Sequence, residues 1–288
     1  MIQLHGLTKR YGDLTAVDGL TVDIAPGRVT GFLGPNGAGK STTIRMILGL
    51  DRPSAGGALV GGRPYTSLKR PLHEVGALLE AKGVHPARSG RAHLLALARS
   101  NGIAARRVDT ALDQVGLAGA AGRRAGTYSL GMMQRLGIAG ALLGDPGVLV
   151  LDEPVNGLDP DGVRWIRDLM RSLAAEGRTV FVSSHLMSEM QQTADHLVVI
   201  ARGRLVRDAP AEAVRASAVT VRSPDAAGLA RLRERLGTGA EPSGSDGLRL
   251  TGITAAEVGD LAHSLGVRLH ELATTHESLE AAYLELTR

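Results

Sequence analysis

A glycine-rich segment at residues 34–42 constrains the fold of this chain more than any other part of its sequence. It reads Gly-Pro-Asn-Gly-Ala-Gly-Lys-Ser-Thr, follows an apolar run at residues 29–33, and leads into helical residues 42–50. This is the pattern G-x-x-x-x-G-K-S/T in the place that its mechanism requires, between a strand and a helix. The segment therefore predicts a phosphate-binding loop at the edge of a parallel sheet.

The roles expected in this loop follow from its residue types. Glycines let successive N–H groups turn toward phosphate oxygens, and the helix N-terminus adds the positive end of its dipole. Lys40 supplies a point charge for the outer phosphates, and Ser41 supplies a ligand for Mg²⁺. The alternative, a glycine-rich turn beside a solvated lysine, is disfavoured by the flanking strand and helix. The predicted phosphate-binding residues are Gly34, Pro35, Asn36, Gly37, Ala38, Gly39, Lys40, Ser41 and Thr42.

A pair of carboxylates follows another apolar run. Residues 148–151 lead directly into Asp152 and Glu153. A buried strand delivers such a pair to the edge where open α/β sheets bind ligands. Phosphoryl transfer to water needs one group that positions the metal and one that orients or deprotonates the water, so we assign Asp152 to Mg²⁺ and Glu153 to the water. Taken alone, the pair would indicate a helix cap; the phosphate-binding loop favours the catalytic interpretation.

The remaining apolar runs alternate with helical segments. Runs at 75–79, 148–151, 179–183 and 197–200, with helices at 160–175 and 186–193, predict a mainly parallel sheet covered on both faces. Residues 2–8 and 20–24 alternate as strands and predict an antiparallel β subdomain. Residues 84–145 are rich in Ala and Leu at helical spacing and predict a helical subdomain. The cluster of turn-forming residues at 53–62 is expected to end the helix that begins at residue 42.

The pattern restarts near Pro210 as a second, smaller domain. Strands are expected at 218–222, 248–251 and 267–272, helices at 226–236, 255–265 and from residue 277, and a loop at 237–247. We predict an α/β fold with a P-loop NTPase core of mainly parallel sheet over residues 1–212 and a small C-terminal α+β accessory domain over residues 213–288.

Composition narrows the classes of function. The chain has no cysteine, which excludes disulfides and cysteine-ligated zinc, and its apolar runs fall short of the roughly 20 residues that a membrane span needs. Two Phe, four Tyr and one Trp argue against binding single-stranded nucleic acid by base stacking. The net charge of +4 is interpreted as a solvated surface rather than a nucleic-acid footprint. Residues 1–9 hold no sustained apolar segment typical of a signal peptide.

Residues 128–135 carry a resemblance to a known family. They read Tyr-Ser-Leu-Gly-Met-Met-Gln-Arg and match in part the signature segment of ATP-binding cassette (ABC) subunits, the motors of membrane transporters. Ser129 and Gly131 stand where that family has them, and the resemblance implies that they face ATP bound on a second copy. Leu130 replaces a usual glycine and Met132 a usual glutamine, a variant that looks like the antibiotic- and lantibiotic-exporting branch. The alternative for Ser129 is a plain helix N-cap.

Three further positions match the family, a fourth departs from it, and each of the four has an ordinary alternative. Asp159 lies in a loop through which two subunits would communicate, or it caps the helix that follows. His185 would contact the γ-phosphate, or it is a surface histidine. Tyr11 would stack on adenine, or it packs in a hairpin. Glu80 stands where most relatives have glutamine and would lie near Mg²⁺, or it is an exposed loop acid.

The resemblance implies a function for the whole chain. It predicts an ATPase that binds ATP and Mg²⁺, closes as a dimer, and powers a separate transmembrane permease from the cytoplasmic face of the membrane, with export of a drug, antibiotic or peptide favoured. No direct contact with nucleic acid is expected. The alternative is a soluble ABC-type ATPase acting on nucleic acid or ribosomes, but the 48 residues between Glu80 and Ser129 leave no room for the long coiled coil such proteins often insert. A phosphate-loop kinase or switch GTPase has no use for the signature serine, and intact Glu153 counts against an interaction-only protein.

Overall fold

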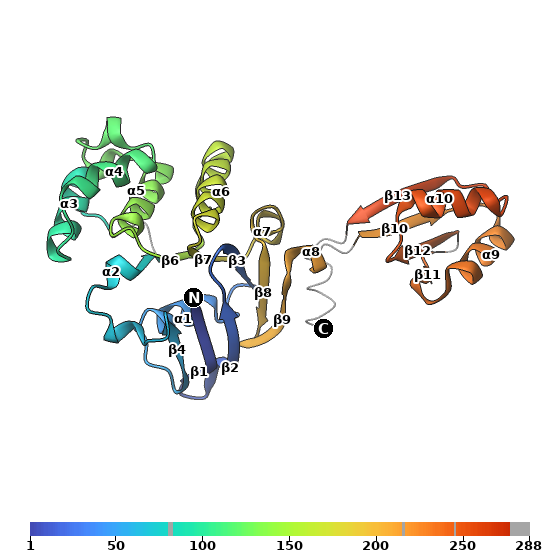
Figure 1. Ribbon diagram of the computed structural model, residues 1–288, viewed down its shortest axis with the longest axis horizontal. Helices are drawn as coiled ribbons and strands as arrows, with labels where there is room; N and C mark the ends of the chain where they lie inside the picture. Colours follow the sequence, from blue (N-terminus) through green and yellow to red (C-terminus); the bar gives the residue numbers. More distant parts are fainter. Residues whose placement is uncertain (80–82, 215–216, 245, 277–288) are drawn as a thin grey trace. The chain divides into compact units, whose positions relative to one another are not determined.

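The computed structural model describes residues 1–79, 83–214, 217–244 and 246–276 (Figure 1). They belong to two compact units, Met1–Pro210 and Ala211–Arg288. The sequence predicts a domain boundary after residue 212, and this boundary stays a prediction. The division into two compact units falls after residue 210.

A six-stranded sheet forms the centre of the first unit. Its strand order is β5-β6-β7-β3-β8-β9, with every pair parallel except β8 and β9. The strands are β3 (Arg28–Leu33), β5 (Val75–Leu78), β6 (Val148–Asp152), β7 (Thr179–Ser184), β8 (His196–Ala201) and β9 (Arg204–Pro210). Val150, Phe181 and Val198 in the inner strands are fully buried, as expected when helices cover a parallel sheet. Helices α1 (Lys40–Ile47), α6 (Pro160–Ala175) and α7 (Met187–Thr193) pack against it.

A three-stranded antiparallel sheet packs beside this core. Its order is β2 (Leu14–Ile24), β1 (Ile2–Tyr11) and β4 (Ala55–Val60). Strand β4 was not predicted, because the glycine-rich cluster at residues 53–62 was interpreted only as the end of the preceding helix. The strand exists because it pairs with β1 from Ile2 opposite Val60 onward, and Gly56 permits this approach: a Cβ there would lie 2.2 Å from the carbonyl oxygen of Gly6.

A group of helices is inserted between β5 and β6, as expected. It follows the short helix α2 (Pro71–Glu74) and contains α3 (Gly90–Ser100), α4 (Arg106–Gln114) and α5 (Leu130–Leu142), which lie together in Figure 1. Leu94, Val108, Leu112 and Leu136 fill the space between the three helices and are almost entirely buried. None of the helices in the described ranges is long and apolar enough to cross a membrane.

The second unit alternates strands and helices around a four-stranded antiparallel sheet. Its elements are the short helix α8 (Ala211–Val214), β10 (Ser217–Arg222), α9 (Ala226–Leu236), β11 (Ala240–Pro242), β12 (Gly247–Thr251), α10 (Ala255–Ser264) and β13 (Glu271–His276). The strand order β11-β12-β10-β13 gives the ferredoxin-like βαββαβ topology.

Two expectations for this unit were wrong. β11 lies inside the segment predicted as a loop, and the last strand begins at Glu271 rather than at Val267. Val267 is apolar and buried, but it packs near Gly228 of α9 instead of pairing in the sheet. The final helix predicted from residue 277 lies outside the described residues.

Candidate functional site

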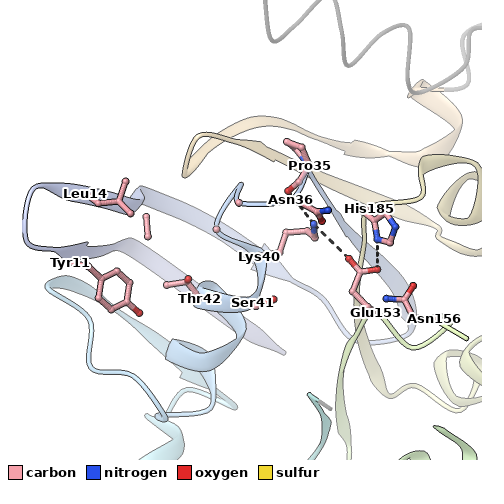
Figure 2. Close-up of a pocket in the computed structure, with 13 residues that line it drawn as sticks. Tyr11, Leu14, Pro35, Asn36, Lys40, Ser41, Thr42, Glu153, Asn156 and His185 are labelled. Carbon is pink, nitrogen blue, oxygen red and sulfur yellow. Dashed lines mark hydrogen bonds and ion pairs between the residues drawn. The ribbon is translucent and has the colours of Figure 1, made fainter. Parts of the chain in front are cut away.

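A cleft of about 560 Å³ brings together four separate parts of the first unit (Figure 2). The glycine-rich loop forms its centre, Glu153 and His185 stand on one side, and Tyr11 stands at the other end. The lining residues are Tyr11, Leu14, Ala16, Pro35, Asn36, Gly37, Gly39, Lys40, Ser41, Thr42, Glu153, Asn156 and His185. Most of the predicted site therefore meets in one place, because parallel strands β3, β6 and β7 end at the same edge of the sheet.

The loop needs its glycines for close packing against neighbouring backbone. Gly39 precedes α1 with φ 103°, and a Cβ there would lie 2.5 Å from the carbonyl oxygen of Ala16. A Cβ on Gly34 would lie equally close to the carbonyl oxygen of Ile200. The loop is thus held between β2 and β8 in a conformation that side chains would prevent. Gly34 and the buried Ala38 support the loop without lining the cleft.

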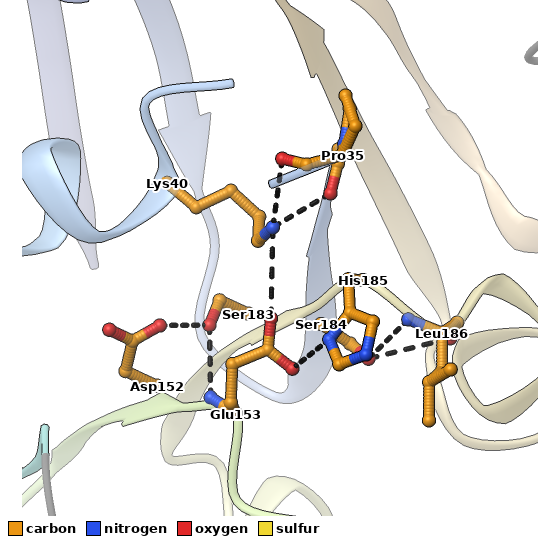
Figure 3. A network of polar contacts seen from close by, with 9 residues as sticks. Pro35, Lys40, Asp152, Glu153, Ser183, Ser184, His185 and Leu186 are labelled. Carbon is orange, nitrogen blue, oxygen red and sulfur yellow. Dashed lines mark hydrogen bonds and ion pairs between the residues drawn. The ribbon is translucent and has the colours of Figure 1, made fainter. Parts of the chain in front are cut away.

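The side chain of Lys40 is held in place by oxygen atoms of the protein (Figure 3). Its side chain is 7% exposed, and its Nζ donates to the carbonyl oxygens of Gly34 at 2.7 Å and Pro35 at 3.3 Å. The same Nζ lies 3.7 Å from Oε1 of Glu153. A buried ammonium facing the cleft, inside a cradle of glycines, fits the phosphates of a nucleotide.

Glu153 leaves its strand in an unusual backbone conformation. Its φ is 50°, in the left-handed region that costs a residue with a side chain roughly 1–2 kcal/mol. Its N–H donates to the carbonyl oxygen of Ser183 at 3.2 Å and to the Ser183 hydroxyl at 3.0 Å, which together hold this conformation. The resulting turn directs the carboxylate toward Lys40 and His185, and Nδ1 of His185 lies 2.8 Å from Oε2.

Ser183 also belongs to the site, although the sequence did not predict a role for it there. Its hydroxyl donates to the carboxylate of Asp152, which pairs with it across β6 and β7, and accepts from the N–H of Glu153 (Figure 3). The signal available in the sequence was a polar residue closing the apolar strand at residues 179–183. Ser183 thereby sets the position of both carboxylates.

The oxygen atoms at this edge suit a magnesium ion in part. The hydroxyl of Ser41 lines the cleft, and Asp152 stands at the end of β6, half-buried and outside the lining. Mg²⁺ takes one or two protein oxygens and completes its shell with water and substrate phosphates. Accordingly, the described ranges contain no cluster of three or more His, Asp or Glu side chains arranged for a metal. Glu80, the third predicted metal residue, lies outside the described residues.

Tyr11 offers an aromatic face at the far end of the cleft. The residue is 48% exposed, its hydroxyl donates to Asp51 at 3.2 Å, and Nζ of Lys9 lies 4.9 Å from the ring centre. Desolvation and then the hydrogen bond to Asp51 raise the pKa of Tyr11. The hydroxyl is thus engaged by Asp51, which does not line the cleft, and the ring face remains as the binding feature.

The predicted signature residues do not line the cleft. The Ser129 hydroxyl caps α5 by accepting from the N–H of Met132 at 3.2 Å, and Asp159 caps α6 by accepting from the N–H of Gly162 at 2.8 Å. Both ordinary alternatives considered for these two residues are therefore realised. A Cβ placed on Gly131 would lie 3.5 Å from Cδ2 of Leu158.

Comparison with known proteins places this site in a family. Residues 17–156 match the model of the ABC transporter family, and residues 217–280 match a domain of unknown function. The bacitracin transport ATP-binding protein BcrA of Bacillus licheniformis is 43% identical over 213 residues, which are 73% of this chain and 70% of that protein. This chain belongs to the ABC transporter ATP-binding family.

Other members of the family agree with this assignment. The lantibiotic transport ATP-binding protein SrtF of Streptococcus pyogenes is 34% identical over 72% of this chain and 89% of its own length. The dimeric structure of a bacterial ABC transporter cassette is 25% identical, with a TM-score of 0.67 over 73% of this chain and 99% of that one. The predicted resemblance and the α/β P-loop fold are confirmed. As an ABC subunit with this cassette, the chain binds ATP and is an ATPase.

Proposed function

We propose that this ABC ATPase works as the motor of an exporter, closing as a dimer over two ATP molecules and driving a separate transmembrane permease. The family supports transport, because relatives at 34–43% identity carry the names of bacitracin and lantibiotic transport subunits. Another relative, the Nod factor export ATP-binding protein I of Burkholderia orbicola, is 37% identical over 79% of this chain and 78% of its own length. Export of a drug, antibiotic or peptide from the cytoplasmic face is the direction these relatives favour.

The observation that carries the catalytic part of the proposal is the placement of Glu153. Its carboxylate stands inside the cleft between the ammonium of Lys40 and the imidazole of His185. A carboxylate in that position can accept a proton from a water that attacks the terminal phosphate. Lys40 neutralises charge on the outer phosphates, and His185 orients the carboxylate and faces the γ-phosphate. Ser41 and Asp152 would hold Mg²⁺, which neutralises phosphate charge when bound.

Nucleotide binding must change the contacts that the ammonium of Lys40 makes in the cleft. The ammonium of Lys40 is shared among two carbonyl oxygens and Glu153. Phosphate oxygens compete for that ammonium, so nucleotide binding weakens its attraction to Glu153. The carboxylate then keeps the contact with His185 and is free to take a proton from water. Binding therefore prepares the base for hydrolysis.

The proposed dimer is supported by two residues that match the family signature but do not line the cleft. Ser129 and Gly131 do not line it, and a similar cassette has been solved as a dimer. In a two-fold dimer, the N-terminus of α5 from one copy is placed to face the phosphates bound by the other, and its dipole favours negative charge there. The residues around Asp159 would lie between the two copies.

The decisive experiment isolates the assembly. The tagged chain is purified from native membranes in detergent, and co-purifying proteins are identified, with the Lys40→Ala chain as a nucleotide-binding control. We expect a protein with membrane-spanning segments to co-purify with the ATPase chains. Recovery with ribosomes or nucleic acid and no membrane protein would instead establish the soluble-ATPase alternative.

A further inference from the structure

The side chain of Leu130 occupies the space above Gly157. Gly157 has φ 75° and lies in the loop between β6 and α6, two residues before Asp159. A Cβ on Gly157 would lie 2.1 Å from Cδ2 and 2.7 Å from Cγ of Leu130. Leu130 is 53% exposed, so the loop at Gly157 covers only part of its side chain. The leucine that departs from the family pattern therefore depends on a glycine at position 157.

A hydrogen bond one helical turn later ties the same two segments together. The side chain of Gln134 is buried, and its Nε2 donates to the carbonyl oxygen of Pro154 at 2.9 Å. Residues 130 and 134 share one face of α5, since side chains four apart are neighbours on a helix. Pro154 directly follows Glu153. Two contacts therefore join the first turns of α5 to the loop that leaves the catalytic strand.

A third contact strengthens the connection further along α5. The guanidinium of Arg135 lies 4.2 Å from the ring centre of Trp165 on α6, and its Nη1 donates to the carbonyl oxygen of Val115 at 3.0 Å. This contact holds the helical insert to α6, but it does not touch the loop that carries Glu153. Leu130 and Gln134, by contrast, contact the loop that carries Glu153 directly.

We propose that Leu130 and Gln134 are positioning residues that make the N-terminus of α5 and the 153–159 loop move as one piece. The inference rests on the proposed dimeric function. When nucleotide binding changes the contacts of Glu153, the loop transmits the change to α5 of the same copy. The end of α5 that carries Ser129 is then aligned on the phosphates bound by the other copy. The two sites of the dimer are coupled through these contacts within each chain.

The first test uses a double-mutant cycle at positions 130 and 157. Gly157→Asn is the informative change, because Asn tolerates a positive φ while its Cβ still displaces Leu130. The half-exposed leucine can rotate away, so the fold should survive, with an unchanged thermal midpoint. We expect Gly157→Asn and Leu130→Ala each to lower kcat by about tenfold, and the double variant to be no worse than either, because residues in contact do not act additively. Additive losses, or single variants with normal kcat, would overturn the proposal.

The second test concerns Gln134. Gln134→Glu preserves the side-chain length but removes the donor to Pro154, and Gln114→Glu makes the same change at an exposed position of α4. We expect Gln134→Glu to leave ATP affinity of the monomer unchanged within about twofold, to lower kcat by about tenfold, and to abolish cooperativity in ATP. Gln114→Glu should match wild type. Equal loss of thermal stability and activity in Gln134→Glu, with cooperativity kept, would show a purely structural role.

One control separates this inference from the proposed function. ATP-dependent dimerisation is measured for wild type, for Glu153→Gln and for the positioning variants. If wild type never dimerises, the proposed dimer fails. If wild type dimerises and hydrolyses ATP cooperatively while every positioning variant behaves like wild type, the dimer stands and the coupling path is wrong.

Discussion

The two oxygens of the Glu153 carboxylate have different partners in the cleft, and the closer one is His185. Nδ1 of His185 lies 2.8 Å from Oε2, whereas Nζ of Lys40 lies 3.7 Å from Oε1. One carboxylate thus links the phosphate-binding loop to the strand end that carries the histidine. The carboxylate is thus oriented by the nearer imidazole, and groups held in a fixed orientation stabilise developing charge without having to be reoriented during the reaction.

Substitutions at Lys40 and Glu153 should separate binding from chemistry. Lys40→Ala removes a charged donor and should weaken ATP binding by about ten- to a hundredfold. Glu153→Gln keeps the shape but cannot accept the proton, so it should bind ATP and lose at least about a hundredfold in turnover. Equilibrium binding and steady-state ATPase assays measure both. Near-normal hydrolysis by Glu153→Gln would remove that residue from its assigned role.

Tyr11 should act through its ring and not through its hydroxyl. Tyr11→Ala should cost about 1–3 kcal/mol in the affinity for ATP, the usual value of stacking one base on an aromatic side chain. Tyr11→Phe should bind ATP like wild type, since the hydroxyl is bonded to Asp51. Stacking reads no hydrogen-bond pattern, so GTP should bind within about tenfold of ATP. Strong preference for ATP would show that another group reads the base.

Two defective chains should restore one working site when mixed. Ser129→Arg blocks the end of α5, and Lys40→Ala disables the phosphate-binding loop, so each homodimer should be inactive. An equal mixture should recover up to about a quarter of wild-type ATPase, because half of the dimers are mixed and each has one intact site. Formation of mixed dimers is checked by differently tagged chains. If mixed dimers form and stay inactive, each chain hydrolyses ATP without its neighbour.

The loop before α3 should contribute to permease docking. Arg88 is exposed there and does not line the cleft. Arg88→Glu should leave ATPase of the purified dimer near wild type and reduce binding to membranes that contain the permease. Arg207→Glu, an equal charge reversal at an exposed position of β9, serves as the control. Normal membrane binding by Arg88→Glu would place the docking surface elsewhere. The sequence also places Lys82 in this segment, but that residue lies outside the described residues.

His93 on α3 should make stability depend on pH. Desolvation, and then the charge of Arg88, lower the pKa of His93 from its ordinary value of 6.5. The unfolded chain therefore binds a proton that the folded chain resists, and stability should fall as pH drops through about 6.5. His93→Gln should flatten this part of the profile. Urea unfolding at about pH 7.5 and about pH 5.5 measures the difference. If the unfolding free energy changes equally with pH in both proteins, the assignment to His93 is wrong.

Local patterns predicted the elements that form by themselves. The helices at 160–175 and 226–236 have the expected bounds, because each combines an N-cap aspartate with regular apolar spacing. Strands β4, β9 and β11 were missed. The residues of β4 and β11 are poor strand formers, and each of the three strands pairs with another strand whose presence its own residues do not reveal. The prediction that Val267 begins the last strand was wrong, because an apolar residue can be buried without belonging to a strand.

The sequence alone determined the phosphate-binding loop, the two carboxylates and the family, because these depend on residue type and on spacing along a few neighbouring positions. Only the tertiary structure decided how they meet. The positive φ of Glu153 and the hydrogen bonds of Ser183 bring the carboxylate to Lys40 and His185, which lie 113 and 32 positions away along the chain. The same is true of Leu130 above Gly157. Such contacts depend on the relative placement of separate strands and helices, which burial of a shared core sets and which short-range spacing does not contain.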